Sequence, residues 1–419
     1  MADPRLTRLF LFLALAANLS AAPQHTLLLK EAAAAAKGGD NATALAKVEA
    51  AAKLRPDYPR IQLNLARLNA ATGKPDAALA ALERLADMGM GLNLAADPAL
   101  APLYDLPRFK EITSRLTAAA SVAHGELTPL RLKGVTGILE SCLIDPATGD
   151  WYFGDVRNRC IWQRGADGTL RKVTSDEDKL DGVFKLLLTP DRKTLWAGTA
   201  SVGAMAGATA DEEGARSALV AFDFASGKIT ARHPTPADGR KHLLGDFILA
   251  ADGALYATDS FSPVIWRLAP GGTQLEPWLE NDDFLNLQGL AFSADGKSLF
   301  VSDYSNGIWR IDVATKAMAL LAAPANATFF GIDGIYAIPG GLLAIQNGVN
   351  PQRVLRIDPA TGATQVVAGG YPAMTDLSLG TLAGDRFHFI ADSGWALFDP
   401  PPAKAPPARE VTIYSFKVN

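Results

Sequence analysis

The chain has 419 residues, of which 48% are hydrophobic and 20% are charged, the composition of an ordinary globular protein. This length leaves room for two domains and a large core. The formal net charge is −4, so the chain lacks the excess of basic residues with which proteins bind polyanions. No nucleic acid partner is therefore expected.

The first 22 residues have the pattern of a secretory signal peptide. Arg5 and Arg8 precede an apolar run over residues 9–19, and the small residues 20–22 offer a cleavage site. The apolar run is too short to span a bilayer comfortably. We therefore expect an exported protein, periplasmic or secreted, with no membrane span in the mature chain. The alternative is an uncleaved anchor or a buried helix.

Residues 25–118 have helical periodicity and are predicted to form a small all-α domain. Two similar units, residues 25–58 and 59–92, each place a glycine between paired helices and make the second helix rich in Ala. Their length matches tetratricopeptide units, and residues 107–116 are expected to cap them. The domain is either a packing module or a groove for a protein partner. A binding solenoid usually has at least three repeats, which favours packing.

The rest of the chain repeats one pattern of short strands. Residues 287–312 carry it most clearly, with apolar runs over 289–292, 298–302 and 307–311 separated by turns rich in Asp, Asn, Ser and Gly. Copies recur at roughly forty-five residues, the spacing of propeller blades. They cover residues 138–164, 182–200, 245–269, 287–312, 331–358 and 376–398. These six copies predict an all-β six-bladed β-propeller over residues 127–419.

A propeller has to pair the two ends of its chain, because an open ring would expose sheet edges. Residues 410–418 and 127–133 are each expected to form a strand without a partner in its own repeat. We predict that one or both complete a blade whose other strands lie far away in the sequence. The Pro-rich run over residues 399–409 is then expected as a surface excursion between the third and fourth strands of the last blade.

Cys142 and Cys160 are the two cysteines of the chain. The strand pattern places them on the first and third strands of the first blade, about 9–10 Å apart at the usual strand spacing. A disulfide requires Cα atoms within about 7 Å of each other. We therefore predict two buried free thiols.

The innermost strand of each blade lines the central channel of a propeller, and the starts of these strands meet at one mouth. Polar residues occupy the six starts: Glu140, Lys185, Asp246, Gln288, Asp333 and Asp376. Buried carboxylates are unfavourable unless they are paired or bound to a metal. Oxygen ligands on a wide ring suit a hard cation such as Ca²⁺. The sequence thus predicts Ca²⁺ at the channel mouth. The alternative is that the acids cap strand ends, and Lys185 would neutralise part of the ring.

Other polar residues are interpreted as structural. The ends of the second strands are expected to form Asx turns. They are Asp155, Thr199, Asp259, Asp303, Asn347 and Asp392. His242, four residues before Asp246, is either a general base at the mouth or a loop residue that makes one hydrogen bond. His388, within a strand, is expected to pack in the core or on a sheet face.

Three strand–turn–strand segments start with a polar residue: ILESCLIDPATGDWYFGDV, LQGLAFSADGKSLFVSDY and GIDGIYAIPGGLLAIQNG. In these segments the propeller region resembles the senescence marker protein and gluconolactonase superfamily of calcium-dependent six-bladed propellers. The resemblance implies that Glu140, Gln288 and Asp333 hold the metal ion, and that Asp246 is a ligand or a base. Gln288 stands where the superfamily usually has Asn, and Gly245-Asp246 where it usually has Asn-Asp.

Members of that superfamily are mostly hydrolases of lactones and esters, in which Ca²⁺ polarises the carbonyl group and activates water. The resemblance therefore implies an exported calcium-dependent hydrolase of a small lactone or ester. Asp246 and Asp333 would be its catalytic residues, with Lys185, His242 and Asp376 as further residues of the channel mouth. The alternative is a non-catalytic propeller that binds a ligand or a protein, with the helical domain as an interaction module.

Overall fold

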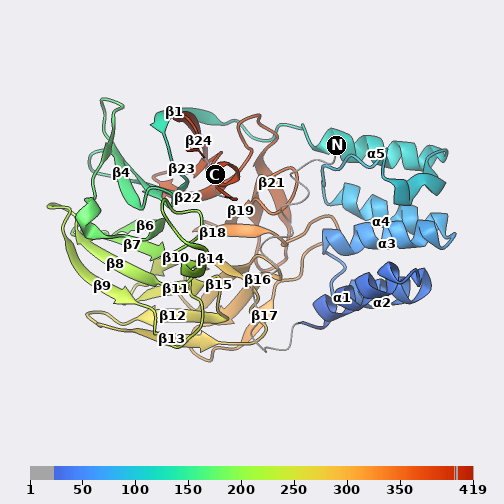
Figure 1. Ribbon diagram of the computed structural model, residues 1–419, viewed down its shortest axis with the longest axis horizontal. Coiled ribbons are helices and arrows are strands. Elements are labelled where there is room, and N and C mark those ends of the chain that lie inside the picture. Colours follow the sequence, from blue (N-terminus) through green and yellow to red (C-terminus); the bar gives the residue numbers. More distant parts are fainter. Residues whose placement is uncertain (1–22, 401, 403, 419) are drawn as a thin grey trace. The chain divides into compact units, whose positions relative to one another are not determined.

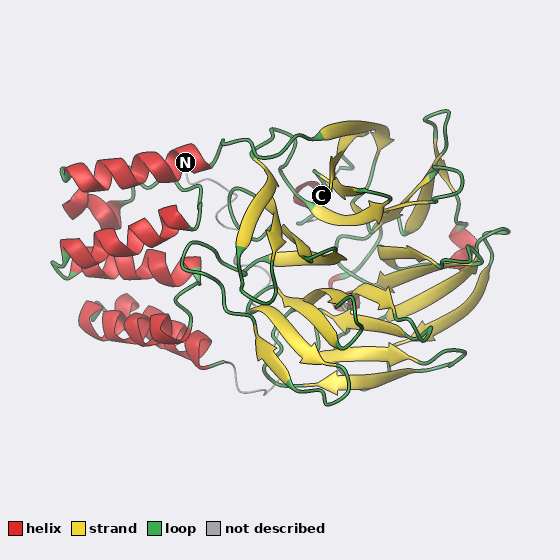
Figure 2. Ribbon diagram, turned by 180° about the vertical axis from the view of Figure 1, so that it is seen from behind, coloured by secondary structure: helices red, strands yellow, loops and turns green. Residues whose placement is uncertain are grey.

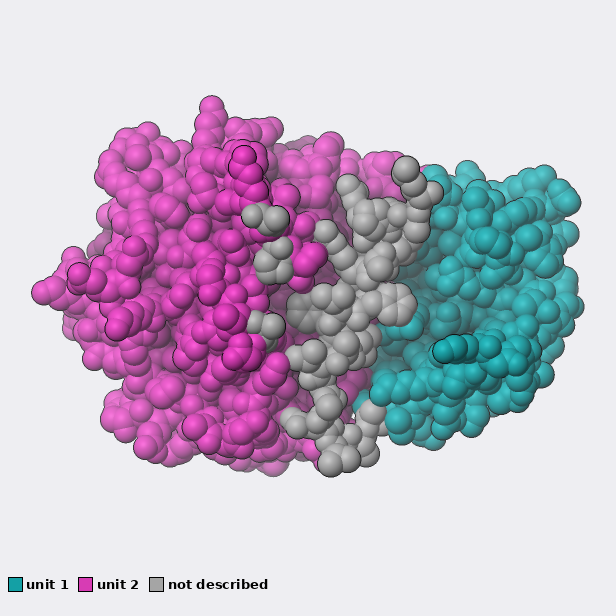
Figure 3. All heavy atoms as spheres, in the orientation of Figure 1, with its two compact units in different colours: residues 1–117 teal, residues 118–419 magenta. Residues whose placement is uncertain are grey.

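The computed structural model describes residues 23–418 apart from 401 and 403, so the predicted signal peptide lies outside the described residues. The chain divides into two compact units, residues 1–117 and 118–419, which Figure 3 colours separately. Among the described residues, the α-helices belong to the first unit, with the last of them ending at Ala119, and the β-strands belong to the second (Figure 2).

The first unit consists of helical hairpins. Its elements are α1 (Gln24–Lys37), α2 (Asn41–Leu54), α3 (Pro59–Ala71), α4 (Pro75–Asp87), the 3₁₀ helix η2 (Pro98–Leu103) and α5 (Pro107–Ala119). Asp40 caps α2 by accepting a hydrogen bond from the backbone N–H of Thr43 at 3.0 Å. Proline opens α3 and α4, where its missing N–H has no partner to lose. Ala44, Leu82 and Leu85 are fully buried between the helices.

The second unit is a six-bladed propeller, as predicted. Each blade is a four-stranded antiparallel sheet. Blade 1 comprises β2 (Leu139–Ile144), β3 (Trp151–Asp155), β4 (Cys160–Arg164) and β5 (Leu170–Lys172); blade 2 comprises β6 (Gly182–Leu188), β7 (Thr194–Ala200), β8 (Ser217–Asp223) and β9 (Ile229–Pro234); blade 3 comprises β10 (Leu244–Leu249), β11 (Leu255–Asp259), β12 (Val264–Leu268) and β13 (Leu275–Glu280). Blade 4 comprises β14 (Leu287–Phe292), β15 (Ser298–Asp303), β16 (Gly307–Asp312) and β17 (Met318–Leu320); blade 5 comprises β18 (Ile332–Ile338), β19 (Gly341–Gln346), β20 (Arg353–Ile357) and β21 (Thr364–Gly369); blade 6 comprises β22 (Ser378–Ala383), β23 (Arg386–Ile390), β24 (Arg409–Lys417) and β1 (Thr128–Val135).

The first strands of the blades form the inner ring. Each of them contacts the first strands of both neighbouring blades, from β2 through β6, β10, β14, β18 and β22 back to β2. Short 3₁₀ helices η3 (Asp176–Asp178), η4 (Ala210–Glu212) and η5 (Trp395–Leu397) lie in the loops between strands. The predicted placement of the strand starts on one central channel therefore holds.

Blade 6 closes the ring with strands from both ends of the propeller. β1 pairs antiparallel with β24, with Thr128 opposite Ser415 and Leu132 opposite Val411. In Figure 1 the teal β1 lies beside the red β24. This pairing confirms that both orphan strands complete one blade.

One prediction about blade 6 was wrong. The Pro-rich run lies between the second strand β23 and the third strand β24, whereas it was expected between the third and fourth strands. The residues expected as the third strand turn instead into η5. Gly394 just before it has φ +93°, which extended backbone does not adopt, and the prolines that follow cannot donate ladder hydrogen bonds.

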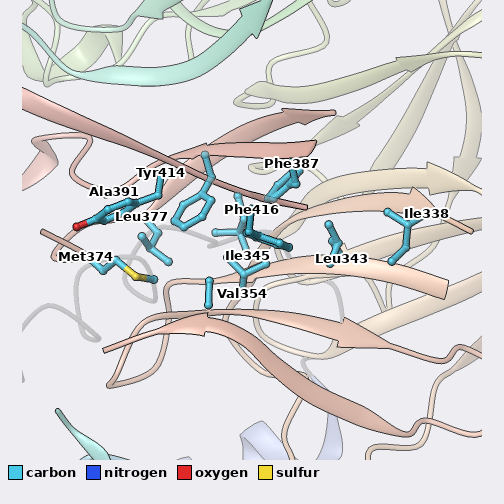
Figure 4. Packing of buried hydrophobic residues seen from close by; sticks show 12 residues of the cluster. Ile338, Leu343, Ile345, Val354, Met374, Leu377, Phe387, Ala391, Tyr414 and Phe416 are labelled. Atoms are coloured by element: carbon cyan, nitrogen blue, oxygen red, sulfur yellow. The ribbon is translucent and has the colours of Figure 1, made fainter. Parts of the chain in front are cut away.

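Apolar side chains fill the spaces between adjacent blades. Figure 4 shows one such cluster, in which Leu343 and Ile345 of β19 meet Phe387 of β23 and Phe416 of β24. These residues alternate with residues of the opposite sheet face, as expected for strands buried between two sheets.

The two cysteines are free and buried, as predicted. Cys142 lies on β2, and Cys160 begins β4, with β3 between the two strands. Burial raises the pKa of the Cys142 thiol to about 12. A thiol that holds its proton at neutral pH is a poor nucleophile.

Candidate functional site

Every first strand carries a β-bulge close to its start. Its register against the second strand shifts between Leu139 and Ser141, Val183 and Lys185, Leu244 and Asp246, Leu287 and Leu290, Ile332 and Ile335, and Ser378 and Gly380. A bulge leaves a residue out of the ladder and redirects its side chain. Glu140, Gln288 and Asp333 lie in these bulges. Three of the residues predicted at the mouth thus owe their positions to one repeated irregularity.

Five of the predicted residues interact electrostatically. Glu140, Asp246, Asp333 and Asp376, called here the acid cluster, come from four blades, and Lys185 comes from a fifth. Asp333 is the shared member, because it interacts with all three other acids and with Lys185. Residues near the starts of five first strands thus interact across the blades.

The carboxyls of the acid cluster destabilise one another's charged forms. Burial raises the pKa of Glu140 well above its usual range, and the nearby charge of Asp333 raises it further. Burial likewise raises the pKa of Asp333, reinforced by Asp246 and opposed by Asn347 and Lys185. Like charges that share a site favour either protonation or a bound cation. Glu140 and Asp333 therefore favour their protonated forms unless a cation stabilises their charge.

Lys185 neutralises one acid. Its Nζ lies 3.0 Å from Asp246 Oδ1 and 5.3 Å from the centre of the Tyr336 ring. Asp246 Oδ1 also accepts a hydrogen bond from the backbone N–H of Phe247 at 2.7 Å. Burial raises the pKa of Asp246, and the charge of Lys185 opposes that rise. Asp246 is therefore held in a buried ion pair.

The side chain of Gln288 is oriented by hydrogen bonds to Asn286 and Ser260. Its Nε2 donates to Asn286 Oδ1 at 2.8 Å, and the Ser260 hydroxyl donates to its Oε1 at 3.5 Å. Among the described residues no hydrogen bond joins Gln288 to Glu140 or to Asp333. The weakly bonded amide oxygen is the part of this side chain that a ligand could still engage.

Asn347 belongs to the site, although the sequence placed it among the structural turns. It follows β19, and its Nδ2 donates to Asp333 Oδ2 at 2.8 Å and to the carbonyl of Leu377 at 2.9 Å. Its Oδ1 is buried and has no hydrogen-bond partner among the residues that the structure describes. In the sheet register Gln346, and not Asn347, takes the position of the buried aspartates that end the second strands of blades 1, 3 and 4, so the repeat gave no signal for Asn347.

Trp395 is a second residue that the sequence interpretation missed. Its indole N–H donates to Glu140 Oε2 at 2.6 Å, and its backbone N–H donates to Asp376 Oδ2 at 2.9 Å. It was assigned to a strand, whereas the excursion of blade 6 brings it to the acid cluster. Nothing in the local sequence marks it as a residue of the site.

His242 lies apart from the acid cluster and is held as a structural residue. Its Nδ1 is 2.6 Å from Asp259 Oδ2, and its Nε2 is 3.0 Å from Asp238 Oδ1. Both ring nitrogens are therefore occupied by carboxylates, and the side chain is buried. Of the two roles predicted for His242, the structural one agrees with this geometry, with two hydrogen bonds in place of one.

The aspartates at the ends of second strands fasten the following turn, as predicted. Asp155, Asp259 and Asp303 each accept a backbone N–H from the residue three positions later. Each also accepts an indole N–H from the start of the third strand, from Trp162, Trp266 and Trp309 respectively. Blade 5 replaces this pair by Gln346 and Arg353, and blade 6 by Asp392 and Arg409. These residues join strands within a blade, and of them Asp392 also acts on the acid cluster, because its charge raises the pKa of Asp376.

The donors at the mouth fit a hard cation. Within residues 23–418, gaps excepted, no three or more His, Cys, Asp and Glu side chains gather in a way that would hold a metal by themselves. Ca²⁺ also accepts amide, backbone and water oxygens. Glu140 and Asp333 are carboxyls that a cation would stabilise in their charged forms, and the Oδ1 of Asn347, which has no hydrogen-bond partner among the described residues, belongs to the amide that is bonded to Asp333. A mixed set of carboxylate and amide oxygens is the donor chemistry that Ca²⁺ prefers.

Comparison with known protein families identifies part of the helical unit. The tetratricopeptide repeat family matches residues 35–90, which confirms the repeats predicted in the helical region. Among curated proteins, none matches this chain.

Solved structures similar to the chain are propellers of several activities. One is a gluconolactonase from Xanthomonas campestris, with 18% identity and a TM-score of 0.49 over 71% of this chain and 93% of that chain. Another is virginiamycin B lyase from Staphylococcus aureus, with 16% identity and a TM-score of 0.45 over 63% of this chain and 82% of that chain. A third is an aldose sugar dehydrogenase from Streptomyces coelicolor, with 16% identity and a TM-score of 0.44 over 70% of this chain and 100% of that chain. The strand order makes residues 118–419 a six-bladed propeller, and tetratricopeptide repeats precede it in the chain.

Proposed function

We propose that this protein is an exported, calcium-dependent hydrolase of small lactones or esters, with its active site at the channel mouth of the propeller. The observation that carries the proposal is the acid cluster, in which four carboxylates from four blades meet and Lys185 offsets one of them. Carboxyls whose charged forms are unfavourable in a buried site are stabilised as carboxylates when a cation binds. The resemblance of the strand starts to the gluconolactonase superfamily supports the reaction class.

The residues of the mouth have complementary roles in this proposal. Glu140 and Asp333 would hold Ca²⁺, together with the amide oxygens of Gln288 and Asn347. When bound, the ion would polarise the substrate carbonyl and lower the pKa of a water molecule. Asp333 is also the proposed general base, because its carboxylate lies in the acid cluster and can accept a proton from a water molecule there. Asn347 holds Asp333 Oδ2, which directs Oδ1 to accept the proton.

Asp246 is the second proposed catalytic residue, and the ion pair with Lys185 keeps it oriented. Asp376 supports the cluster from blade 6 through hydrogen bonds to Ser393 and Trp395. The proposed exported location rests on the leader pattern of residues 1–22, and N-terminal sequencing of the mature protein would test it. None of the described helices is long and apolar enough to cross a membrane.

Metal analysis and a substrate panel test the proposed function. We expect purified protein to contain calcium and to hydrolyse lactones or aryl esters in a chelator-sensitive manner. Glu140→Gln should lower kcat/KM by about 100-fold, because a carboxylate ligand becomes neutral. Glu410→Gln is the matched control, since Glu410 lies on β24 in an exposed ion pair with Arg131 and its loss should leave turnover unchanged.

Absence of calcium together with unchanged activity in Glu140→Gln would overturn the calcium mechanism. Absence of turnover on the whole panel, with ligand binding retained, would support the non-catalytic alternative. The tetratricopeptide match over residues 35–90 supports a protein partner for the helical unit in either case. Crosslinking of the full chain, with Leu27→Ser and Leu54→Ser on the exposed face of that unit, tests this role.

A further inference from the structure

Residues 393–398, called here the Trp395 segment, lie between β23 and β24 and are fixed at both ends. At the first end, the Ser393 hydroxyl donates to Asp376 Oδ2 at 2.7 Å, and the Ser393 carbonyl accepts from Arg409 Nη2 at 2.6 Å. At the other end, Phe398 is buried, with the guanidinium of Arg157 5.0 Å from the centre of its ring. The segment is therefore held by blade 6 and by the neighbouring blade 1.

The anchored segment presents Trp395 to two acids at once. Its backbone N–H reaches Asp376 and its indole N–H reaches Glu140, which belong to blades 6 and 1. The indole bond of 2.6 Å to a carboxylate is short and charge-assisted, the stronger class of hydrogen bond. The ring centre lies 6.2 Å from that of Phe184 in blade 2. These contacts fix both the position and the rotamer of Trp395.

Gly394 permits this approach. Its φ is +93°, and a Cβ at this position would collide with Arg409 Nη2, which is itself held by Ser393 and Asp392. A larger residue would therefore displace the turn that directs Trp395 toward the mouth. The position directly before Trp395 therefore requires glycine.

Trp395 differs from the tryptophans that only join strands. Trp162 and Trp266 also donate an indole N–H to a carboxylate, but their partners Asp155 and Asp259 lie in the same blade and outside the acid cluster. Trp395 bonds across the closure of the ring to an acid of the mouth, and it remains half-buried. The same indole–carboxylate hydrogen bond thus joins Trp395 to a residue of the acid cluster, whereas Trp162 and Trp266 bond to structural aspartates.

We propose that Trp395 is a positioning residue that holds Glu140 in the orientation needed to bind Ca²⁺. The inference rests on the proposed calcium function. The indole N–H occupies Glu140 Oε2 and thereby restricts the rotation of the carboxylate. Partners that orient a metal-binding side chain typically change metal affinity by 10–100-fold when they are removed. Trp395 acts through Glu140 and need not touch the substrate.

Calorimetric titration of the metal-free full-length protein with CaCl₂ tests the inference. Trp395→Phe keeps an aromatic ring and removes the donor, so we expect calcium affinity to fall by about 10-fold. kcat/KM of this variant should fall at limiting calcium and recover at saturating calcium, which a general loss of folding would not produce. Trp162→Phe is the matched control: it removes an indole–carboxylate bond of 2.9 Å away from the acid cluster and should leave calcium affinity unchanged.

The outcomes are distinguishable. Wild-type binding with equal affinity in Trp395→Phe overturns the inference and leaves the proposed function intact. An equal loss in Trp162→Phe also overturns it, because the effect would then be general. Wild-type protein that binds no calcium overturns the proposed function and the inference with it. Should Trp395→Phe fail to fold, Trp395→His, which retains a ring N–H donor, should bind calcium more tightly than Trp395→Leu; equal affinities would contradict the inference.

Discussion

The imidazole of His242 lies between the carboxylates of Asp259 and Asp238 and against the ring of Trp266. Burial by itself would lower its pKa, but the two carboxylates together raise it above 6.5. Burial also opposes ionisation of Asp238, yet hydrogen bonds from Arg240 and His242 lower its pKa to about 2. The charged forms of both side chains are thus the stable ones in the folded protein.

His242 makes stability dependent on pH. Because its folded pKa is raised, its contribution is complete below the unfolded value of 6.5 and disappears as pH rises through the folded pKa. His242→Gln should therefore lose about 3 kcal/mol at about pH 6 and less at about pH 9, measured by thermal unfolding.

His388→Gln is the control of opposite sign. Burial lowers the pKa of His388 to about 4, so protonation of the unfolded chain penalises the wild type as the solution becomes acidic. This variant should gain stability relative to wild type on acidification. A pH-independent effect of His242→Gln would contradict the proposed charge state.

The residues of the site were predictable only in part. Glu140, Asp246 and Asp333 stand at repeated positions, and repetition is visible in a sequence. Asn347 and Trp395 were missed for different reasons. Asn347 lies one residue beyond the position that structural aspartates occupy in other blades, and Trp395 reaches Glu140 across 255 residues through an irregular loop.

At the scale of elements, close backbone approach fixes the end of β19 beside the site. Gly348 donates its N–H to the carbonyl of Gly331 at 3.0 Å. A Cβ at Gly348 would lie 2.5 Å from Gly331 Cα and 2.7 Å from the Tyr304 hydroxyl. Only glycine allows the turn after Asn347 to pack this tightly against the loop before β18.

Gly348→Ala should destabilise the protein by about 2 kcal/mol through overpacking, and it should displace Asn347 from Asp333. Urea unfolding measures the loss. Gly165→Ala is the control, since a Cβ there would meet its nearest atom at 3.5 Å, an ordinary contact. Equal midpoints for the two variants would show that the loop yields without strain.

The three inner strands of each blade were more predictable than the fourth. Turn chemistry and apolar runs locate β14, β15 and β16 to within one or two residues. The fourth strand β17 has three residues, too few for a periodicity to appear. The third strand of blade 6 was misplaced because its connection to β23 is long and rich in proline, so adjacency in sequence no longer indicated adjacency in the sheet.

At the scale of the whole molecule, β24 lies between β1, from the start of the propeller, and β23, from its last blade. Ile413 in its middle faces Leu130 of β1 on one side and Ile390 of β23 on the other. The propeller therefore depends on one strand that has no duplicate in the other blades.

Ile413→Pro should destabilise the protein by about 3 kcal/mol or more, because proline removes a ladder hydrogen bond from a central strand. Ala319→Pro, on the exposed outer strand β17, should have a much smaller effect. Chemical unfolding of both variants measures the difference. Similar losses of unfolding free energy in the two variants would mean that β24 contributes no more to stability than the outer strand β17.

The pairing of β1 with β24 also determines the order in which the blades can assemble during synthesis. Arg131 and Glu410, which pair across these strands, are 279 residues apart, so β1 leaves the ribosome long before its partner exists. Blades 1 to 5 can assemble from contiguous chain, whereas blade 6 has to wait for the final residues. Because Trp395 and Asp376 belong to that last blade, a nascent chain that ends before residue 376 carries Glu140 without either of these neighbours.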